Sequence, residues 1–377
     1  MLALVLLAAS FCATASAQGT IPLIDSYTVD QRYSKNKPDY PEISWPTLNF
    51  EAGQTISFDR LYKEDESRKL HVDVFEPTED ARNGKAVILV HGGAWRSGNK
   101  SHMFPLANLL AQRGYTVFTP EYRLSAEAAY PTGMTDLGDL VVWVKSSAEE
   151  FGVEPEAVAI AGGSSGGHMA ALLAYAAHEP LYKSDPAQNT SLAAVIDMDG
   201  VLDFETELAL KYEDYGKEKS GVALWVGGSY EQTTDIWVEL SPVTHLSERS
   251  PPTLVISSGN ERFTEGHEEV EAVLARHGIP YEFFSYEGLF AKTQELEPVQ
   301  PFVYSLMMWR YRTFLHHYRE HGYALLSGRI GYYSVHKDST IILKYEEDLR
   351  MAEAVLRARE VGDEEPEYDP VVAELTD

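Results

Sequence analysis

The stretch Ile160-Ala161-Gly162-Gly163-Ser164-Ser165-Gly166-Gly167-His168-Met169-Ala170 places two serines between two pairs of glycines. An apolar run typical of a buried strand leads into it, and an Ala/Leu-rich segment typical of a helix follows. The glycines and serines therefore occupy a strand-to-helix turn. The pattern G-x-S-x-G at such a turn is typical of a nucleophilic serine held on a strained backbone. Frames centred on Ser164 and on Ser165 both satisfy it, and a turn that merely caps a helix is the alternative.

Strands and amphipathic segments alternate on both sides of this turn, which predicts an α/β fold with a mostly parallel central sheet flanked by helices. Residues 201–250 fit no simple strand–helix unit and are expected to form a small cap insertion. Strands are predicted at 70–75, 85–90, 115–119, 158–161, 194–196, 252–256 and 281–284, and helices at 102–113, 134–149, 166–177 and 265–277.

A second glycine motif, His91-Gly92-Gly93-Ala94-Trp95, follows the strand predicted to end at Val90. In a hydrolase of this topology, the loop after that strand supplies amides to the oxyanion hole. We therefore expect the amides of Gly92 and Gly93 to take this role. The alternative is that both glycine motifs are only tight turns.

These motifs, together with Glu121-Tyr122-Arg123-Leu124-Ser125 and Tyr130-Pro131, resemble the α/β-hydrolase esterases of the hormone-sensitive-lipase and feruloyl or acetyl-xylan esterase type. The resemblance extends over about residues 68–317. It implies an α/β-hydrolase fold, Ser164 as the nucleophile and the amide of Ser165 as a further oxyanion donor. It also implies a small-molecule or carbohydrate ester as substrate, with no cofactor and no metal. A histidine is often found in the family at the position of His168, where we expect it to order the loop.

The same resemblance locates the other two members of a catalytic triad. Glu261 stands where the family has an acidic residue, although it could equally be a surface residue paired with Arg262. Ala291 stands where the family has the catalytic histidine, and His267 is a weak substitute. Two hypotheses follow: a serine esterase whose base is not identified, or a catalytically impaired homologue that binds an ester or sugar ligand.

Two shorter patterns allow a structural and a functional interpretation. Asp197-Met198-Asp199-Gly200 with Asp203 matches part of a calcium loop, but the later glutamate and the alternating ligands are missing, so no metal site is predicted. Three aromatic residues of the insertion could stack on sugar rings or form the core of the insertion. They are Trp225, Tyr230 and Trp237.

The charge of the chain argues against partners that carry negative charge. It has 58 acidic and 31 basic residues, for a net charge of −27. Such a surface repels phosphate backbones and anionic membranes, so nucleic-acid binding is not expected. No segment after the amino terminus is long and apolar enough to span a membrane.

The amino terminus predicts export. The first 17 residues carry no charge and end in Ala15-Ser16-Ala17, which resembles a signal-peptidase site before Gln18, although the usual basic residue is missing. A secreted or periplasmic protein is expected, and without Cys12, the only cysteine, it has no disulfide. The predicted organisation is a signal peptide (1–17), an amino-terminal extension (18–67), a hydrolase domain (68–322) and a carboxyl-terminal extension with an amphipathic helix and an acidic tail (323–377).

Overall fold

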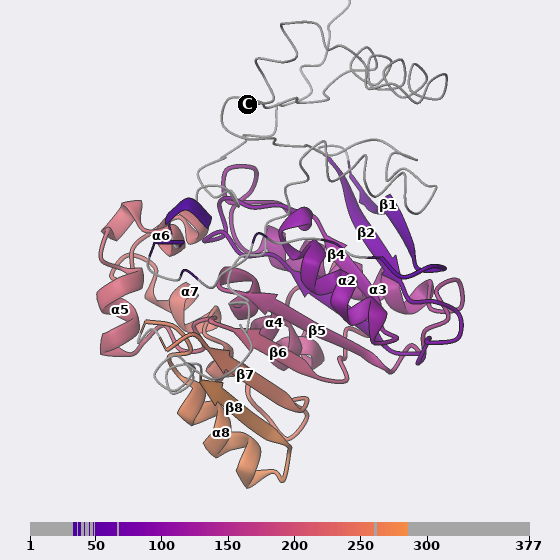
Figure 1. The fold of residues 1–377 in the computed structure, drawn as a ribbon. Coiled ribbons are helices and arrows are strands. Elements are labelled where there is room, and N and C mark those ends of the chain that lie inside the picture. Colours follow the sequence, from indigo (N-terminus) through magenta and orange to yellow (C-terminus); the bar gives the residue numbers. More distant parts are fainter. Residues whose placement is uncertain are drawn as a thin grey trace, which may run out of the picture.

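The structure is a computed structural model that describes residues 33–35, 37–38, 41, 45, 48, 50–65, 68–259 and 262–285. It contains an eight-stranded sheet in the order β1-β2-β4-β3-β5-β6-β7-β8 (Figure 1). β2 pairs antiparallel with both β1 and β4, and all other pairs are parallel. The strands are β1 (Thr55–Glu64), β2 (Lys69–Glu76), β3 (Ala86–Val90), β4 (Thr116–Pro120), β5 (Val158–Gly163), β6 (Val195–Met198), β7 (Thr253–Ser257) and β8 (Tyr281–Ser285).

Helices cover both faces of the sheet. The fully buried strand β3 directs Val87 and Leu89 into one apolar cluster with α2, and Ile88 into the other with α3, α4 and α8. This explains why β3 is a continuous apolar run instead of an alternating one. The α-helices of these layers are α2 (Phe104–Gln112), α3 (Thr132–Ser146), α4 (Ser165–Tyr175) and α8 (His267–Arg276), and the 3₁₀ helices are η1 (Lys100–Met103), η2 (Ala176–His178), η3 (Lys217–Lys219) and η4 (Pro242–His245).

The parallel register brings the carboxyl ends of the central strands to one edge of the sheet. Gly163 of β5 is the register partner of Met198 of β6, and Met198 is the partner of Ile256 of β7. The residues that follow these three strands therefore lie beside one another. Ligands of open α/β sheets bind at this edge.

The insertion between β6 and β7 contains the short helices α5 (Glu207–Glu213), α6 (Gly221–Val226) and α7 (Thr234–Glu239), which lie together on one side of the sheet (Figure 1). Trp225 and Trp237 are almost completely buried, and Tyr230 packs against the same cluster. Of the two interpretations given above for these aromatic residues, the structure therefore shows the core of the insertion. The buried indoles of Trp225 and Trp237 present no stacking surface for a sugar, whereas Tyr230 stays partly exposed.

The predicted mostly parallel sheet with flanking helices is confirmed. One strand was not expected: β1 lies inside 18–67, the segment assigned above to an extension, so the sheet already begins at Thr55. The predicted signal peptide and carboxyl-terminal helix lie outside the described residues. Within the part that is described, no helix has the length and apolar character needed to cross a bilayer.

Candidate active site

Ser164 occupies a strained turn between β5 and α4. Its backbone angles are φ 55° and ψ −125°, which are unfavourable for a residue with a side chain. Such conformations cost on the order of 1–3 kcal/mol and persist only where surrounding contacts enforce them. Here the amide of Ser164 donates to the carbonyl of Met198 at 2.7 Å, and its carbonyl accepts from the amide of His168 at 3.0 Å. The adjacent strand and the first turn of α4 thus hold the serine in place.

The spacing of the glycines distinguishes the two possible serine frames. A Cβ added to Gly162 would lie 2.2 Å from the carbonyl oxygen of Gly166, and one added to Gly166 would lie 2.4 Å from that of Val90. A Cβ on Gly163 would meet nothing within 4 Å. Glycine is therefore required on both sides of the frame centred on Ser164, whereas the frame centred on Ser165 has open space at its first glycine.

The loop after β3 lies directly against this turn. A Cβ on Gly92 would come within 2.5 Å of the Gly163 carbonyl oxygen and 3.2 Å of the Ser164 Cβ, so the two backbones touch. Gly93 has a φ of 134°, and its carbonyl accepts from the hydroxyl of Ser97 at 2.9 Å. Within residues 68–259, the amides of Gly92, Gly93 and Ser165 donate no hydrogen bond to another backbone carbonyl. Three amides next to Ser164 are thus available to a ligand.

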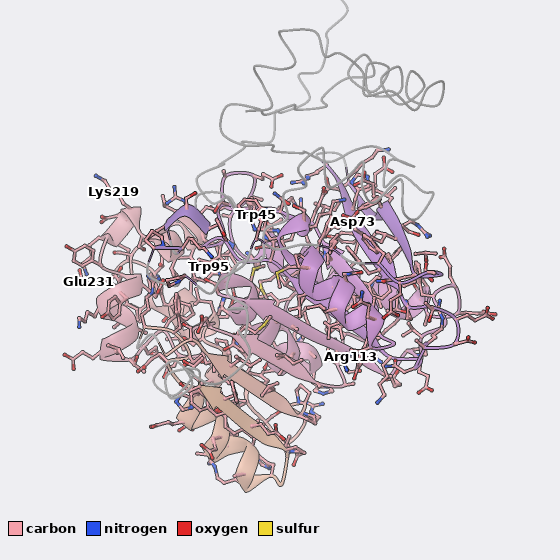
Figure 2. All side chains as sticks on the ribbon, viewed as in Figure 1. Trp45, Asp73, Trp95, Arg113, Lys219 and Glu231 are labelled. Carbon is pink, nitrogen blue, oxygen red and sulfur yellow. The ribbon has the colours of Figure 1, made fainter. Side chains whose placement is uncertain are left out.

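A small pocket opens beside Ser164, with a volume of about 30 Å³. This is room for roughly two water molecules. Figure 2 shows Trp95, one of its walls, between the sheet and the helices of the insertion. The residues that line the pocket are Ala94, Trp95, Ser164, Ser165, His168, Asp199, Val201, Glu213, Arg262 and Phe263.

His168 fixes the Trp95 wall. The indole Nε1 of Trp95 donates to Nδ1 of His168 at 3.1 Å, so Nε2 of His168 carries the proton and donates to the carbonyl of Leu240 at 2.8 Å. Burial lowers the pKa of His168 to about 4, and the ring is neutral at neutral pH. Trp95 is also stacked on Trp225 at 5.2 Å. His168 borders the pocket, but both of its nitrogens are engaged in structural bonds, so it is not placed to accept a proton from Ser164.

We expect His168→Phe to lower the free energy of unfolding by about 2–5 kcal/mol, because the Nε1 of Trp95 and the carbonyl of Leu240 would both lose their partner in a buried place. Urea unfolding measures this change. His178→Phe, at an exposed histidine, is the control and should change stability by less than about 0.5 kcal/mol. Unchanged stability of His168→Phe would contradict the structural role.

Two buried carboxylates lie at the carboxyl end of β6, that of Asp197 within the strand and that of Asp199 directly after it. Asp197 is completely buried; its Oδ1 accepts from the amide of Gly200 at 2.9 Å, and burial, reinforced by the charge of Asp199, raises its pKa to about 8. Asp199 has a φ of 59°, and its Oδ1 accepts from the amide of Ser258 at 2.7 Å. Its Oδ2 is buried without a hydrogen-bond partner in the described part of the chain. In the sequence this segment matches only part of a calcium loop, and no local signal connects Asp199 with Ser164.

A charged pair forms another side of the pocket. Arg262 donates to the carboxylate of Glu213 at 2.7 Å, and its guanidinium lies over the rings of Tyr212 and Phe263. Burial raises the pKa of Glu213. Arg262 thus has a partner from the insertion, which the sequence did not indicate.

The remaining predicted site residues are Glu261, Ala291 and His267. Glu261 and Ala291 lie outside the described residues. His267 does not line the pocket: its ring stacks on Phe283 at 4.1 Å, and its Nδ1 lies 3.3 Å from the hydroxyl of Tyr281. No imidazole of the described residues forms a hydrogen bond with the Ser164 side chain.

The chain matches one protein-family model and several curated esterases. The family model BD-FAE matches residues 72–267. Among curated proteins of Mycobacterium tuberculosis, the probable carboxylic ester hydrolase LipM is 29% identical over 201 residues, which are 52% of this chain and 46% of LipM. The esterase LipC is 26% identical over 211 residues, 53% of this chain and 50% of LipC. The chain thus spans about half the length of these relatives.

Solved structures agree on the fold. A truncated form of a carbohydrate esterase from gut microbiota superposes with a TM-score of 0.54 at 21% identity, over 66% of this chain and 90% of that one. A bifunctional GH43-CE protein of Bacteroides eggerthii gives a TM-score of 0.53 at 22% identity, over 62% of this chain and 35% of that one. At such identities the likeness concerns the fold alone. The predicted α/β-hydrolase fold is confirmed.

Proposed function

The chain belongs to the BD-FAE family, and from this premise we propose that it is a carboxylic ester hydrolase with Ser164 as its nucleophile. The observation that carries the proposal is the strained backbone of Ser164, held against Gly92 and facing a small pocket. The relatives LipM and LipC are named as an ester hydrolase and an esterase, which supports the same reaction class.

The proposed reaction has two steps. The hydroxyl oxygen of Ser164 attacks the ester carbonyl carbon while a base takes the hydroxyl proton, and the amides of Gly92, Gly93 and Ser165 stabilise the oxyanion. Collapse breaks the bond to the alcohol, which leaves with that proton. Water then hydrolyses the acyl-enzyme and releases the acid. An acidic residue orients the base, a role for which the sequence predicts Glu261.

We propose a short acyl group, such as acetyl, on a small or carbohydrate alcohol. Two observations support it: the pocket beside Ser164 is small, and the stacked Trp95 cannot withdraw without losing its bond to His168. The uncharged amino-terminal segment supports export, with a mature amino terminus at Gln18 as its direct consequence.

The test is hydrolysis of p-nitrophenyl acetate together with active-site labelling. We expect Ser164→Ala to remove serine-dependent turnover, leaving at most the background that bound amides and water provide. A fluorophosphonate should modify Ser164, which peptide mass mapping identifies. A label on Ser165 alone would overturn the assignment, and turnover unchanged in Ser164→Ala would overturn the proposal.

A second candidate function is supported by one observation: none of the described imidazoles forms a hydrogen bond with the Ser164 side chain. The protein would then keep its pocket to bind an ester or sugar ligand without turning it over. This candidate requires that purified protein release no p-nitrophenol above the buffer rate, yet gain thermal stability on adding a non-hydrolysed acetylated sugar. Rapid turnover excludes it.

A further inference from the structure

We propose that Asp199, at the carboxyl end of β6, is the carboxylate that orients the catalytic base toward Ser164, in the role that the sequence assigns to Glu261. This inference rests on the proposed esterase function. It makes Asp199 a positioning residue, because its carboxylate acts through the base and does not touch the ester.

The sheet places Asp199 next to the nucleophile. Gly163 and Met198 are register partners on β5 and β6, so Ser164 and Asp199 are the next residues on two adjacent parallel strands. The amide of Ser164 donates to the carbonyl of Met198 at 2.7 Å, which ties the two turns together. Asp199 and Ser164 then line the same pocket.

Ser258 fixes the carboxylate of Asp199: hydrogen bonds from the amide and the hydroxyl of Ser258 oppose the rise in the pKa of Asp199 that burial causes. The amide of Ser258 holds its Oδ1 at 2.7 Å, and the Asp199 amide donates to the carbonyl of Ile256 at 2.9 Å, so β7 fixes both the backbone and the side chain. The residue is 2% exposed, and its Oδ2 has no hydrogen-bond partner in the described residues. A buried acceptor without a partner costs about 1–3 kcal/mol, a cost that an approaching N–H donor removes.

A triad acid needs this arrangement. It must be buried, held rigidly and left with one free oxygen for the imidazole N–H, and it stabilises the imidazolium that forms when the base takes the serine proton. The other pocket carboxylate, Glu213, is already bonded to Arg262. Asp197 does not line the pocket. Its Oδ1 lies against α4, where it would be 2.1 Å from a Cβ added to Gly167.

The experiment uses the full chain carrying Ala291→His as the parent, because this change places a histidine where the family has its base. It compares Asp199→Asn with Glu261→Gln in that parent, using p-nitrophenyl acetate. We expect kcat/KM to fall by about 10²- to 10⁴-fold in Asp199→Asn, mostly through kcat, and to fall at least tenfold less in Glu261→Gln. The acidic limb of the pH–rate profile should move to lower pH in Asp199→Asn, because a base that has lost its anionic partner protonates less readily. A residue with only a structural role would not shift this limb.

The control is Asp203→Asn, the same substitution in the same loop. Asp203 accepts from the amide of Glu205 at 2.8 Å and lies outside the pocket. The activity of Asp203→Asn should therefore stay within about threefold of the parent. Thermal unfolding of every variant shows whether it is folded. Should Asp199→Asn not fold, Glu261→Gln decides alone: a loss below tenfold supports Asp199, and a larger loss in folded protein overturns it.

Three other results would refute the proposed role of Asp199. Equal or greater loss in Glu261→Gln than in Asp199→Asn returns the acid to the loop after β7 and refutes the role of Asp199. A drop in Asp199→Asn without any shift of the acidic limb indicates damage to the pocket and also refutes it. A parent without any turnover contradicts the esterase proposal itself, and the assignment of Asp199 fails with it.

Discussion

Ala291→His is expected to raise ester hydrolysis by about 10²- to 10⁴-fold, the usual contribution of a general base. The physical reason is that the described part of the site holds a strained serine, free amides and a buried acid, but no imidazole bonded to Ser164. The serine hydroxyl alone is a poor nucleophile at neutral pH. Initial rates with p-nitrophenyl acetate, measured from pH 5 to pH 9, should show a new limb with an apparent pKa in the histidine range.

Three controls make this gain interpretable. It should disappear in Ala291→His combined with Ser164→Ala, and it should be much smaller when Ala291→His is combined with Asp199→Asn. Ala291→Gln adds a polar side chain without a base and should give no gain. A parent that already hydrolyses esters rapidly, loses this activity in His267→Ala and gains nothing from Ala291→His would show that the base has moved to another position.

The sequence predicted the sheet well where the strands are buried, because short segments rich in apolar and β-branched residues are a strong signal. β3 and β4 are buried along their whole length. β1 was missed for the opposite reason: its ten residues, Thr55–Glu64, combine charged and apolar residues, and most of them are partly exposed. Nothing in its sequence separates such an edge strand from a polar extension. Its pairing with β2 supplies what the local sequence does not.

The site shows the same division between local and distant contacts. The turn at Ser164 and the loop at Gly92 could be predicted because their glycines form short sequence motifs, although the close contacts that require Gly92 and Gly166 join the two turns to each other. The orientation of the Asp199 carboxylate could not be predicted, since it depends on the amide of Ser258, the residue after β7, far along the chain. The structural role of His168 was expected from its position, but its partners, Trp95 and Leu240, come from two other segments.

Asp197→Asn is expected to change how stability depends on pH. Burial, together with the charge of Asp199, raises the pKa of Asp197 to about 8, whereas an aspartate in the unfolded chain titrates near about 3.9. Between these values the unfolded chain loses a proton that the folded protein keeps. The parent therefore loses stability as the pH rises from about 4 to about 8, by at most about 1.4 kcal/mol per pH unit. Asparagine stays neutral in both states and removes this loss.

Urea unfolding at pH 5 and pH 8 gives the free energy of unfolding of Asp197→Asn and of the parent. Subtracting the two values cancels the groups that titrate alike in both proteins. The difference should move in favour of the variant by about 2–4 kcal/mol between these pH values. Asp80→Asn, at an exposed position, should show no such change. A difference that is independent of pH would mean that Asp197 is ionised in the folded protein. An ionised Asp197 would favour the protonated form of the neighbouring Asp199. A protonated Asp199 cannot stabilise an imidazolium, so this result would also count against its proposed role.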